Sequence, residues 1–327
     1  MVEIPLFLAY NDYGKKVPPV GLLPMDFDIL PPSDDRVFKL ILTSPDSKPA
    51  LMDLIAAIIG QSVKDVVVRN NELPPEDTEE KAERFDVNCV LDDGTQVDLE
   101  MQASRIQEDT DGSYRNLKGK SIYYLCDLHS SQSAKGLRRY DRLARTYQVT
   151  FCSYTVFPER AEYLNTYSFR NDKDGELLAD AVQIVYVELS KLQKIMEKSV
   201  KDMTDLEKWA VFFQYASEPA ARETVNEVIA SKEELQMAGD LLMSISKDER
   251  ERAVFRSRRM YQTDLASDFA TAEDRGERRG IEIGERRGAK NSRIEIARRM
   301  LRRNRPVEEI AEDTGLTAEE VESLKNE

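Results

Sequence analysis

Apolar residues recur at helical spacing in some segments of the chain and at every second position in others, and these two periods predict its elements. Residues 50–59, ALMDLIAAII, are almost all apolar and are followed by Gly60, which predicts a buried helix that ends at a glycine. A second helix is expected to begin near Ser33 or Asp34, with Ser33 as its cap. Its apolar surface is supplied by Phe38, Leu40, Ile41 and Leu42.

Segments rich in β-branched and aromatic residues predict the strands. They are residues 64–69, 149–157, 163–170 and 182–189. Between them we expect a helix over residues 116–130, whose inward positions are Tyr123, Tyr124, Leu125 and Leu128. From residue 205 onward the pattern is helical. The fold class is therefore α/β in the α+β sense: helices flank a mixed central β-sheet, and a helical C-terminal region follows.

This pattern suggests three regions. Residues 1–33 are rich in proline and lack helical periodicity, so we expect a loosely packed N-terminal arm. Residues 34–200 form the core, and residues 201–327 form the helical C-terminal region. The helix expected over residues 205–216 is compatible with either the core or the C-terminal region.

The C-terminal region contains an unusual charge distribution. Residues 275–305 hold twelve Arg and Lys against four Glu, a net charge of +8, whereas the whole chain carries −14. Such asymmetry indicates an anionic partner, or else pairing with the protein's own acidic surface. Four glycines repeat at every fourth position in this segment, either on one helix face that permits close contact with another copy or in a flexible linker. They are Gly276, Gly280, Gly284 and Gly288.

The last residues predict a helix-turn-helix-like tail over residues 307–325. The two helices are expected over residues 307–314 and 317–324, with Gly315 ending the first and Thr317 capping the second. Because this tail is acidic, we expect it to pack or oligomerise rather than read DNA bases.

Composition excludes several kinds of chemistry. His129 is the only histidine, which rules out two-histidine metal sites and a Ser-His-Asp triad, and we expect it in a loop. The three cysteines, Cys89, Cys126 and Cys152, are far apart, so we expect small buried residues in a reducing cytoplasm rather than disulfides or a zinc knuckle. We expect no membrane span and no signal peptide. An enzyme built from this chain would depend on carboxylates, lysines or amides.

The segment FDVNCVLDDGTQVDLEMQ, residues 85–102, predicts a β-hairpin. Asp92-Asp93-Gly94 suits a three-residue loop with the glycine in the left-handed region. In the resulting register Leu91 pairs with Thr95, Asn88 lies opposite Asp98, and Asp86 lies opposite Glu100.

The same register gathers carboxylates on one face of the hairpin. Asp98, Glu100 and Gln102 point to one side of their strand, and Asp86 shares that side. Facing carboxylates repel each other, and a hard divalent cation such as Mg²⁺ or Mn²⁺ between Asp86 and Glu100 would convert the repulsion into ligation. Two alternatives are open: an ordinary solvent-exposed acidic face, or a register slipped by one residue.

The order of these motifs resembles the PD-(D/E)XK nucleases. Asp86, followed by Glu100-Met101-Gln102 on the next strand, is similar to the signature of that superfamily. Asp35-Arg36-Val37-Phe38-Lys39 resembles the opening motif of Rpn-type recombination-promoting nucleases and of related PD-(D/E)XK family transposases, and residues 123–136 and 140–157 are similar to their helix and following strand. The resemblance, which covers residues 24–190, implies a restriction-endonuclease-like core and a Mg²⁺-dependent DNA endonuclease linked to recombination or mobile elements.

The resemblance also assigns roles to individual residues. It implies that Asp35, Asp86, Glu100 and Gln102 form the catalytic site, and that Asp86, Glu100 and the Met101 backbone carbonyl hold Mg²⁺ or Mn²⁺. Gln102 stands where the superfamily most often has lysine. An amide orients water but neither carries charge nor acts as a base, so water activation falls to the metal.

DNA is the expected partner, beside a second copy of the chain bound through the glycine-repeat helix. Candidate DNA contacts are Lys39, Arg115, Lys118 and Lys120, although Lys39 is also placed to pair with Asp35, and the other three suit a solvated helix start. Two further functions are open. One is a degenerate nuclease fold that only binds nucleic acid or protein, and the other is a purely structural oligomer.

Overall fold

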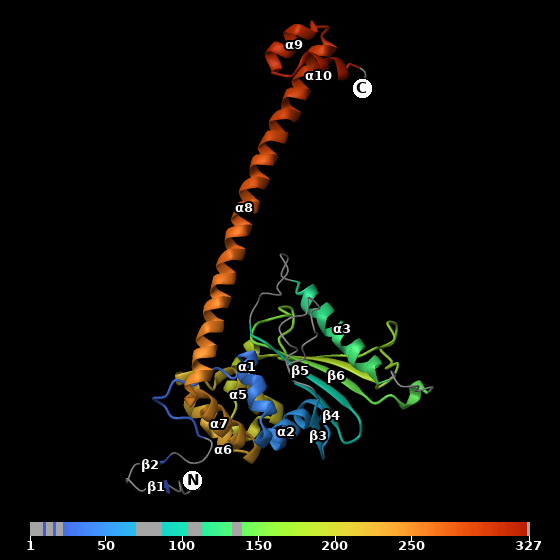
Figure 1. Ribbon diagram of the computed structural model, residues 1–327. Helices are drawn as coiled ribbons and strands as arrows, with labels where there is room; N and C mark the ends of the chain where they lie inside the picture. Colours follow the sequence, from blue (N-terminus) through green and yellow to red (C-terminus); the bar gives the residue numbers. More distant parts are fainter. Residues whose placement is uncertain are drawn as a thin grey trace. The chain divides into compact units, whose positions relative to one another are not determined.

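The computed structural model describes residues 9–10, 16–17, 22–69, 87–103, 113–132 and 139–325 (Figure 1). The chain divides into two compact units, Met1–Arg252 and Ala253–Glu327. We expected the core to end at residue 200, so this boundary lies well beyond the expected one. The helices between the two positions belong to the first unit.

A mixed six-stranded sheet lies at the centre of the first unit. Its strand order is β3-β4-β5-β6-β8-β7. The pairs β5·β6 and β6·β8 are parallel, and the other three pairs are antiparallel. The strands are β3 (Val66–Val68), β4 (Val87–Leu91), β5 (Gln96–Gln102), β6 (Thr146–Cys152), β7 (Leu164–Tyr167) and β8 (Val182–Glu188). A short separate pair is formed by β1 (Ala9–Tyr10) and β2 (Lys16–Val17).

Helices cover both faces of the six-stranded sheet, as the sequence predicts. The helices of the first unit are α1 (Asp35–Thr43), α2 (Lys48–Ile59), α3 (Arg115–Ser131), α4 (Gln193–Met196), α5 (Asp205–Tyr215), α6 (Arg222–Ala230) and α7 (Glu233–Lys247). Figure 1 shows α3 apart from the group that contains α1, α2, α5, α6 and α7. Two contacts agree with this. The ring of Phe38 on α1 packs against the ring of Phe151 on β6, whereas the Tyr186 hydroxyl donates a hydrogen bond to Ser121 of α3 on the opposite face of the sheet.

Local signals fix the ends of the first two helices. Asp34, not Ser33, caps α1: its carboxylate accepts hydrogen bonds from the backbone N–H groups of Arg36 (3.0 Å) and Val37 (3.2 Å). Both residues suit a cap, but Asp34 is the one directly before the first helical residue. Gly60 ends α2 with φ = 69°, as predicted, because that conformation costs glycine little.

An aromatic cluster joins α5 to the sheet. Phe213 lies 5.1 Å from Phe38 and 5.4 Å from Phe151, measured between ring centroids. Trp209 stacks on Phe213, and all four rings are fully buried. Burying such large side chains contributes about 1.5–3 kcal/mol each. This cluster places the 205–216 helix in the core and explains why the unit extends beyond residue 200.

The segment before α1 is more tightly packed than a loose arm. Leu23, Ile29 and Leu30 are buried. The backbone N–H of Leu23 donates to Asn226 of α6 (2.9 Å), and that of Leu30 donates to Ser246 of α7 (3.0 Å). The expectation for residues 1–33 is therefore wrong for residues 22–33, because helices far along the chain supply their partners.

Strands β6 and β7 both end earlier than the sequence suggests: β7, expected over residues 163–170, ends at Tyr167. We expected a strand over residues 149–157, but β6 runs from Thr146 to Cys152. Beyond it, the backbone N–H groups of Val156 and Phe157 donate to the buried Glu188 carboxylate (2.6 and 3.0 Å) instead of to a neighbouring strand. The Glu188 side chain, and not a neighbouring strand, therefore accepts the hydrogen bonds from these two N–H groups.

Helix α3 differs from its expected orientation. Its buried positions are Leu117, Ser121, Leu125 and Leu128. Tyr123, expected to point inward, is 58% exposed. His129 lies in the last turn of α3 rather than in a loop, and its Nδ1 is 2.9 Å from the Thr146 hydroxyl. Cys89 and Cys152 are buried as expected, but Cys126 on this helix is exposed.

The second unit consists of most of α8 (Glu249–Arg302), α9 (Val307–Thr314) and α10 (Ala318–Ser323). The glycine repeat is helical, and a Cβ added at any of its four glycines would meet nothing within 4 Å. The tail matches its prediction, with Gly315 at φ = 67° and Thr317 in a capping box. It packs on the end of α8 through Ala297, Ile310, Leu316 and Val321.

Among the described helices, none is both long enough and apolar enough to cross a lipid bilayer.

Candidate active site

The β4–β5 hairpin has the predicted register throughout its described length. The N–H of Leu91 donates to the Thr95 carbonyl (2.9 Å), and Gly94 adopts φ = 87° in the loop. Asn88 pairs with Asp98, and the last described pair is Val87 with Leu99. Asp86 itself lies outside the described residues.

The acidic face of β5 is buried. Asp98 is 0% exposed and Glu100 is 2% exposed, so the alternative of an ordinary solvated hairpin face is contradicted. Burying a carboxylate costs several kcal/mol unless charged or polar groups compensate. The face must therefore contain compensating groups, and they come from α3 and from β5 itself.

Two donors from the described residues share one oxygen of Glu100. Lys120 of α3 places its Nζ 2.6 Å from Glu100 Oε2, and Gln102 Nε2 donates to the same oxygen at 3.1 Å. The Lys120 side chain is 27% exposed and that of Glu100 is 3% exposed, so the pair spans from the interior to the solvent. The ring of Tyr124 lies 4.9 Å from the Lys120 Nζ, a cation–π distance that supports this lysine conformation.

A row of polar residues crosses the sheet at the level of Asp98, two residues before Glu100 on β5. Asn88, Asp98 and Gln148 are register partners on β4, β5 and β6, and all three are buried. The row therefore lies on the same face as Glu100, beneath α3. Burial first, and the charge of Asp98 second, raise the pKa of the Cys89 thiol. Burial and the nearby Glu188 do the same for the pKa of Cys152, so neither cysteine supplies a thiolate at neutral pH.

Asp35 comes from the helix on the apolar face of the sheet. It is the first residue of α1, is half-buried, and accepts a 2.8 Å hydrogen bond from the N–H of Arg36. Arg36 in turn forms a two-point ion pair with Glu251 at the start of α8 (2.7 and 2.9 Å). Lys39, one turn further on, is also half-buried.

The candidate DNA-contact residues on α3 have different surroundings. Lys120 binds Glu100, as described above. Lys118 donates to the Ser113 carbonyl (2.8 Å) and lies 4.8 Å from the centroid of the Phe157 ring. Arg115 is exposed at the start of the helix. Sequence reasoning missed the Lys120–Glu100 contact, because the two residues lie on different elements and the lysine resembles an ordinary solvated side chain.

A divalent cation fits the donor chemistry of this site. Glu100 is a buried carboxylate whose Oε2 accepts a hydrogen bond from the ammonium group of Lys120, and Gln102 adds an amide oxygen at the end of the same strand. Such oxygen donors suit Mg²⁺ or Mn²⁺. Within the described part of the chain, three or more His, Cys, Asp or Glu side chains do not gather into a metal-binding group. The expected second ligand, Asp86, is outside that part.

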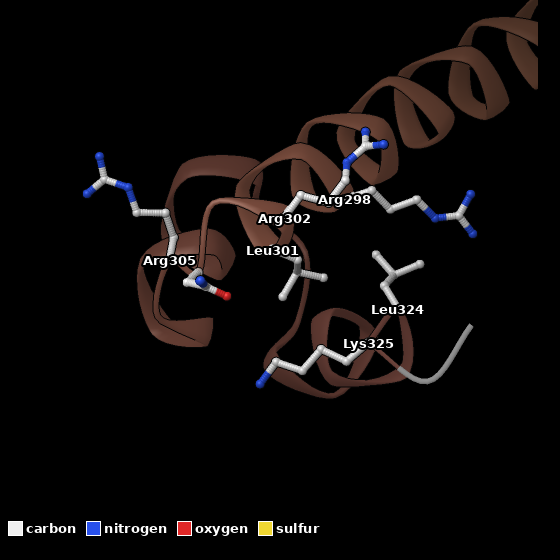
Figure 2. A pocket seen from close by; sticks show the side chains of 7 residues that line it. Arg298, Leu301, Arg302, Arg305, Leu324 and Lys325 are labelled. Carbon is white, nitrogen blue, oxygen red and sulfur yellow. The ribbon is translucent and has the colours of Figure 1, made fainter.

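A separate basic hollow lies in the second unit, where the tail meets the end of α8 (Figure 2). It has a volume of about 850 Å³ and is lined by Arg298, Leu301, Arg302, Asn304, Arg305, Leu324 and Lys325. The arginine heads spread in different directions around the two leucines. Arg305 pairs with Glu309 (3.2 Å) and Lys325 with Glu322 (2.9 Å), so the acidic tail neutralises part of this charge. The remaining charge can attract phosphate groups.

A comparison with protein families gives a match over most of the chain. The model described as PD-(D/E)XK nuclease family transposase covers residues 32–272. This range contains the hairpin, Asp35 and α3, and it extends beyond residue 252 into α8. No curated protein and no solved structure matches the chain.

Proposed function

The chain belongs to the PD-(D/E)XK nuclease family transposases, and from this membership we propose that it is a divalent-metal-dependent DNA endonuclease with its active site at the β4–β5 hairpin. The observation that carries the proposal is the buried Glu100 with Gln102 two residues further along β5. Folding stability alone does not favour a buried carboxylate there, whereas a cation site requires one.

The proposed reaction is hydrolysis of a phosphodiester. A water oxygen adds to phosphorus, one P–O ester bond breaks, and the leaving oxygen takes a proton, which yields a phosphomonoester and a hydroxyl. Asp86, Glu100 and the Met101 backbone carbonyl would hold Mg²⁺ or Mn²⁺. When bound, the ion lowers the pKa of a coordinated water and stabilises charge on the phosphate.

The chain's own side chains would position the reactants. Gln102 is neutral, so its role is to orient the attacking water through its amide. The family resemblance assigns Asp35 to this site as an additional acid, but α1 packs on the face of the sheet opposite to Glu100, so the assignment of Asp35 rests on the resemblance alone. Arg115 and Lys39 are the proposed phosphate contacts, together with the basic residues 275–305 of the second unit. The local charge of +8 over residues 275–305 favours DNA binding by that segment in spite of the chain's net charge of −14.

A second candidate is a nucleic-acid-binding module that has lost catalysis. Gln102 in place of the usual lysine and the acidic charge of the chain favour it. A link to recombination or mobile elements, and pairing of two copies through the glycine-repeat helix, are further proposals that are compatible with either function.

One pair of assays distinguishes the two candidates. DNA binding is measured in EDTA, and cleavage of a supercoiled plasmid is then measured in Mg²⁺ or Mn²⁺. An endonuclease converts the plasmid to nicked or linear forms only when metal is present, and Glu100→Gln abolishes that conversion without abolishing binding. Binding without cleavage, in both the wild-type protein and Glu100→Gln, would favour the binding module.

A further inference from the structure

The candidate site contains the ammonium group of Lys120, which comes from α3, whereas the usual lysine of the superfamily would stand at position 102 on β5. Gln102 of β5 and Lys120 of α3 donate to the same oxygen, Glu100 Oε2, at 3.1 and 2.6 Å. Their nitrogen atoms are therefore neighbours around one atom. The ammonium group of Lys120 therefore lies beside the side chain at position 102.

The surroundings of Lys120 differ from those of an ordinary surface lysine. It pairs with a carboxylate whose side chain is only 3% exposed, and the Tyr124 ring lies 4.9 Å from its Nζ. Lys118, two residues earlier, turns instead to the Ser113 carbonyl and the Phe157 ring. Of these two lysines, only Lys120 is placed on α3 so that its ammonium group contacts Glu100.

We propose that Lys120 is the cationic residue of the nuclease site, supplied by α3 in place of a lysine at position 102. An ammonium group has three donor hydrogens, so it can keep its bond to Glu100 while donating to a non-bridging oxygen of the scissile phosphate. There it stabilises the negative charge that develops as water attacks. This inference rests on the proposed nuclease function and assigns it a residue outside the family-like motif.

The test removes the ammonium group from α3 and then restores one from β5. Lys120→Met removes the ammonium but keeps much of the side-chain length, and it should lower plasmid cleavage about 100-fold or more. Adding Gln102→Lys to Lys120→Met returns an ammonium to the same oxygen from β5, and it should recover at least about tenfold of that loss. Lys194→Ala, which removes an exposed lysine of α4, is the matched control and should leave cleavage unchanged.

Two measurements separate this role from DNA affinity and from folding. DNA binding in EDTA, followed by fluorescence anisotropy, should change less than about twofold in Lys120→Met. Lys120→Arg retains a positive charge and should fold and cleave better than Lys120→Met, which keeps the test decisive if the apolar variant unfolds. Full cleavage by a folded Lys120→Met would overturn the inference. So would a loss of cleavage matched by an equal loss of DNA affinity, or a failure of Gln102→Lys to recover any activity.

Calorimetric titration with Mn²⁺ alone distinguishes failure of this inference from failure of the proposed function. Without the ammonium beside Glu100, Lys120→Met should bind Mn²⁺ more tightly than the wild-type protein, because a like charge has been removed. A wild-type protein that binds Mn²⁺ but never cleaves DNA contradicts the nuclease function. In that case an unchanged Mn²⁺ affinity in Lys120→Met would also overturn the placement of Lys120 in the site.

Discussion

Asn88 on β4 lies directly opposite Asp98 on β5, and this pair fixes the register of the hairpin that carries the candidate site. Two residues earlier on β4, the same register leads to position 86 opposite Glu100. Because side chains alternate across a strand, Asp86 and Glu100 are expected on one face, beneath α3.

The first prediction concerns that pair. In a crystal structure with Mn²⁺, the nearest carboxylate oxygens of Asp86 and Glu100 should lie within about 6 Å of each other, close enough for one cation to contact both. The two side chains on opposite faces of the sheet would contradict the catalytic proposal.

The second prediction concerns Gln102. Because Gln102 positions the attacking water, Gln102→Ala should lower the cleavage rate about 10- to 100-fold. This corresponds to about 1.4–3 kcal/mol of lost transition-state stabilisation. Gln102→Lys alone places a second ammonium beside Lys120, so it should weaken the apparent Mg²⁺ affinity through repulsion. Single-turnover rates measured across a Mg²⁺ titration separate the two effects. Wild-type rates in both variants would remove Gln102 from the site.

The third prediction concerns the buried Glu188. Its carboxylate accepts from the backbone of Val156 and Phe157, from Asn165 (3.0 Å) and from Lys191 (2.7 Å). Glu188→Ala would leave the buried N–H groups of Val156 and Phe157 without their acceptor and would remove the carboxylate that pairs with Lys191. The free energy of unfolding should therefore fall by about 3–5 kcal/mol in urea denaturation. The matched change Glu197→Ala, at an exposed position, should cost less than about 0.5 kcal/mol. Equal stabilities of the two variants would contradict this role of Glu188.

The fourth prediction concerns the C-terminal unit. Deleting residues 275–327 removes the +8 segment and the basic hollow beside the tail. DNA affinity should fall, and its dependence on salt should flatten, because fewer phosphate contacts release fewer counterions. Anisotropy titrations between about 50 and 200 mM salt measure both quantities. Unchanged affinity and an unchanged oligomeric state would show that this segment does not bind DNA or a second copy.

The features predicted correctly from the sequence depend on local signals. Gly60, Gly94 and Gly315 each adopt the left-handed conformation at the expected helix end or turn. Thr317 forms the predicted cap, and alternation along the hairpin gave the correct register. In each case the deciding residues lie within a few positions of one another, so the pattern itself contains the information.

The features that were missed depend on contacts between distant parts of the chain. Glu188 ends β6 early by binding backbone groups about thirty residues away in sequence. Phe213 joins α5 to the core through Phe38 and Phe151, so the first unit extends beyond residue 200. Lys120 meets Glu100 only because α3 crosses this face of the sheet. No periodicity in the sequence encodes such pairings.

Plasmid cleavage by the wild-type protein and by Asp86→Ala tests whether carboxylates of the hairpin bind a metal that cleaves DNA. Both are assayed in Mg²⁺, in Mn²⁺ and in EDTA, after circular dichroism has shown that both are folded. We expect cleavage by the wild-type protein in either metal, none in EDTA, and a loss of at least about 1,000-fold in Asp86→Ala, since a metal ligand is removed. Cleavage by Asp86→Ala at the wild-type rate, or by the wild-type protein in EDTA, would contradict this expectation.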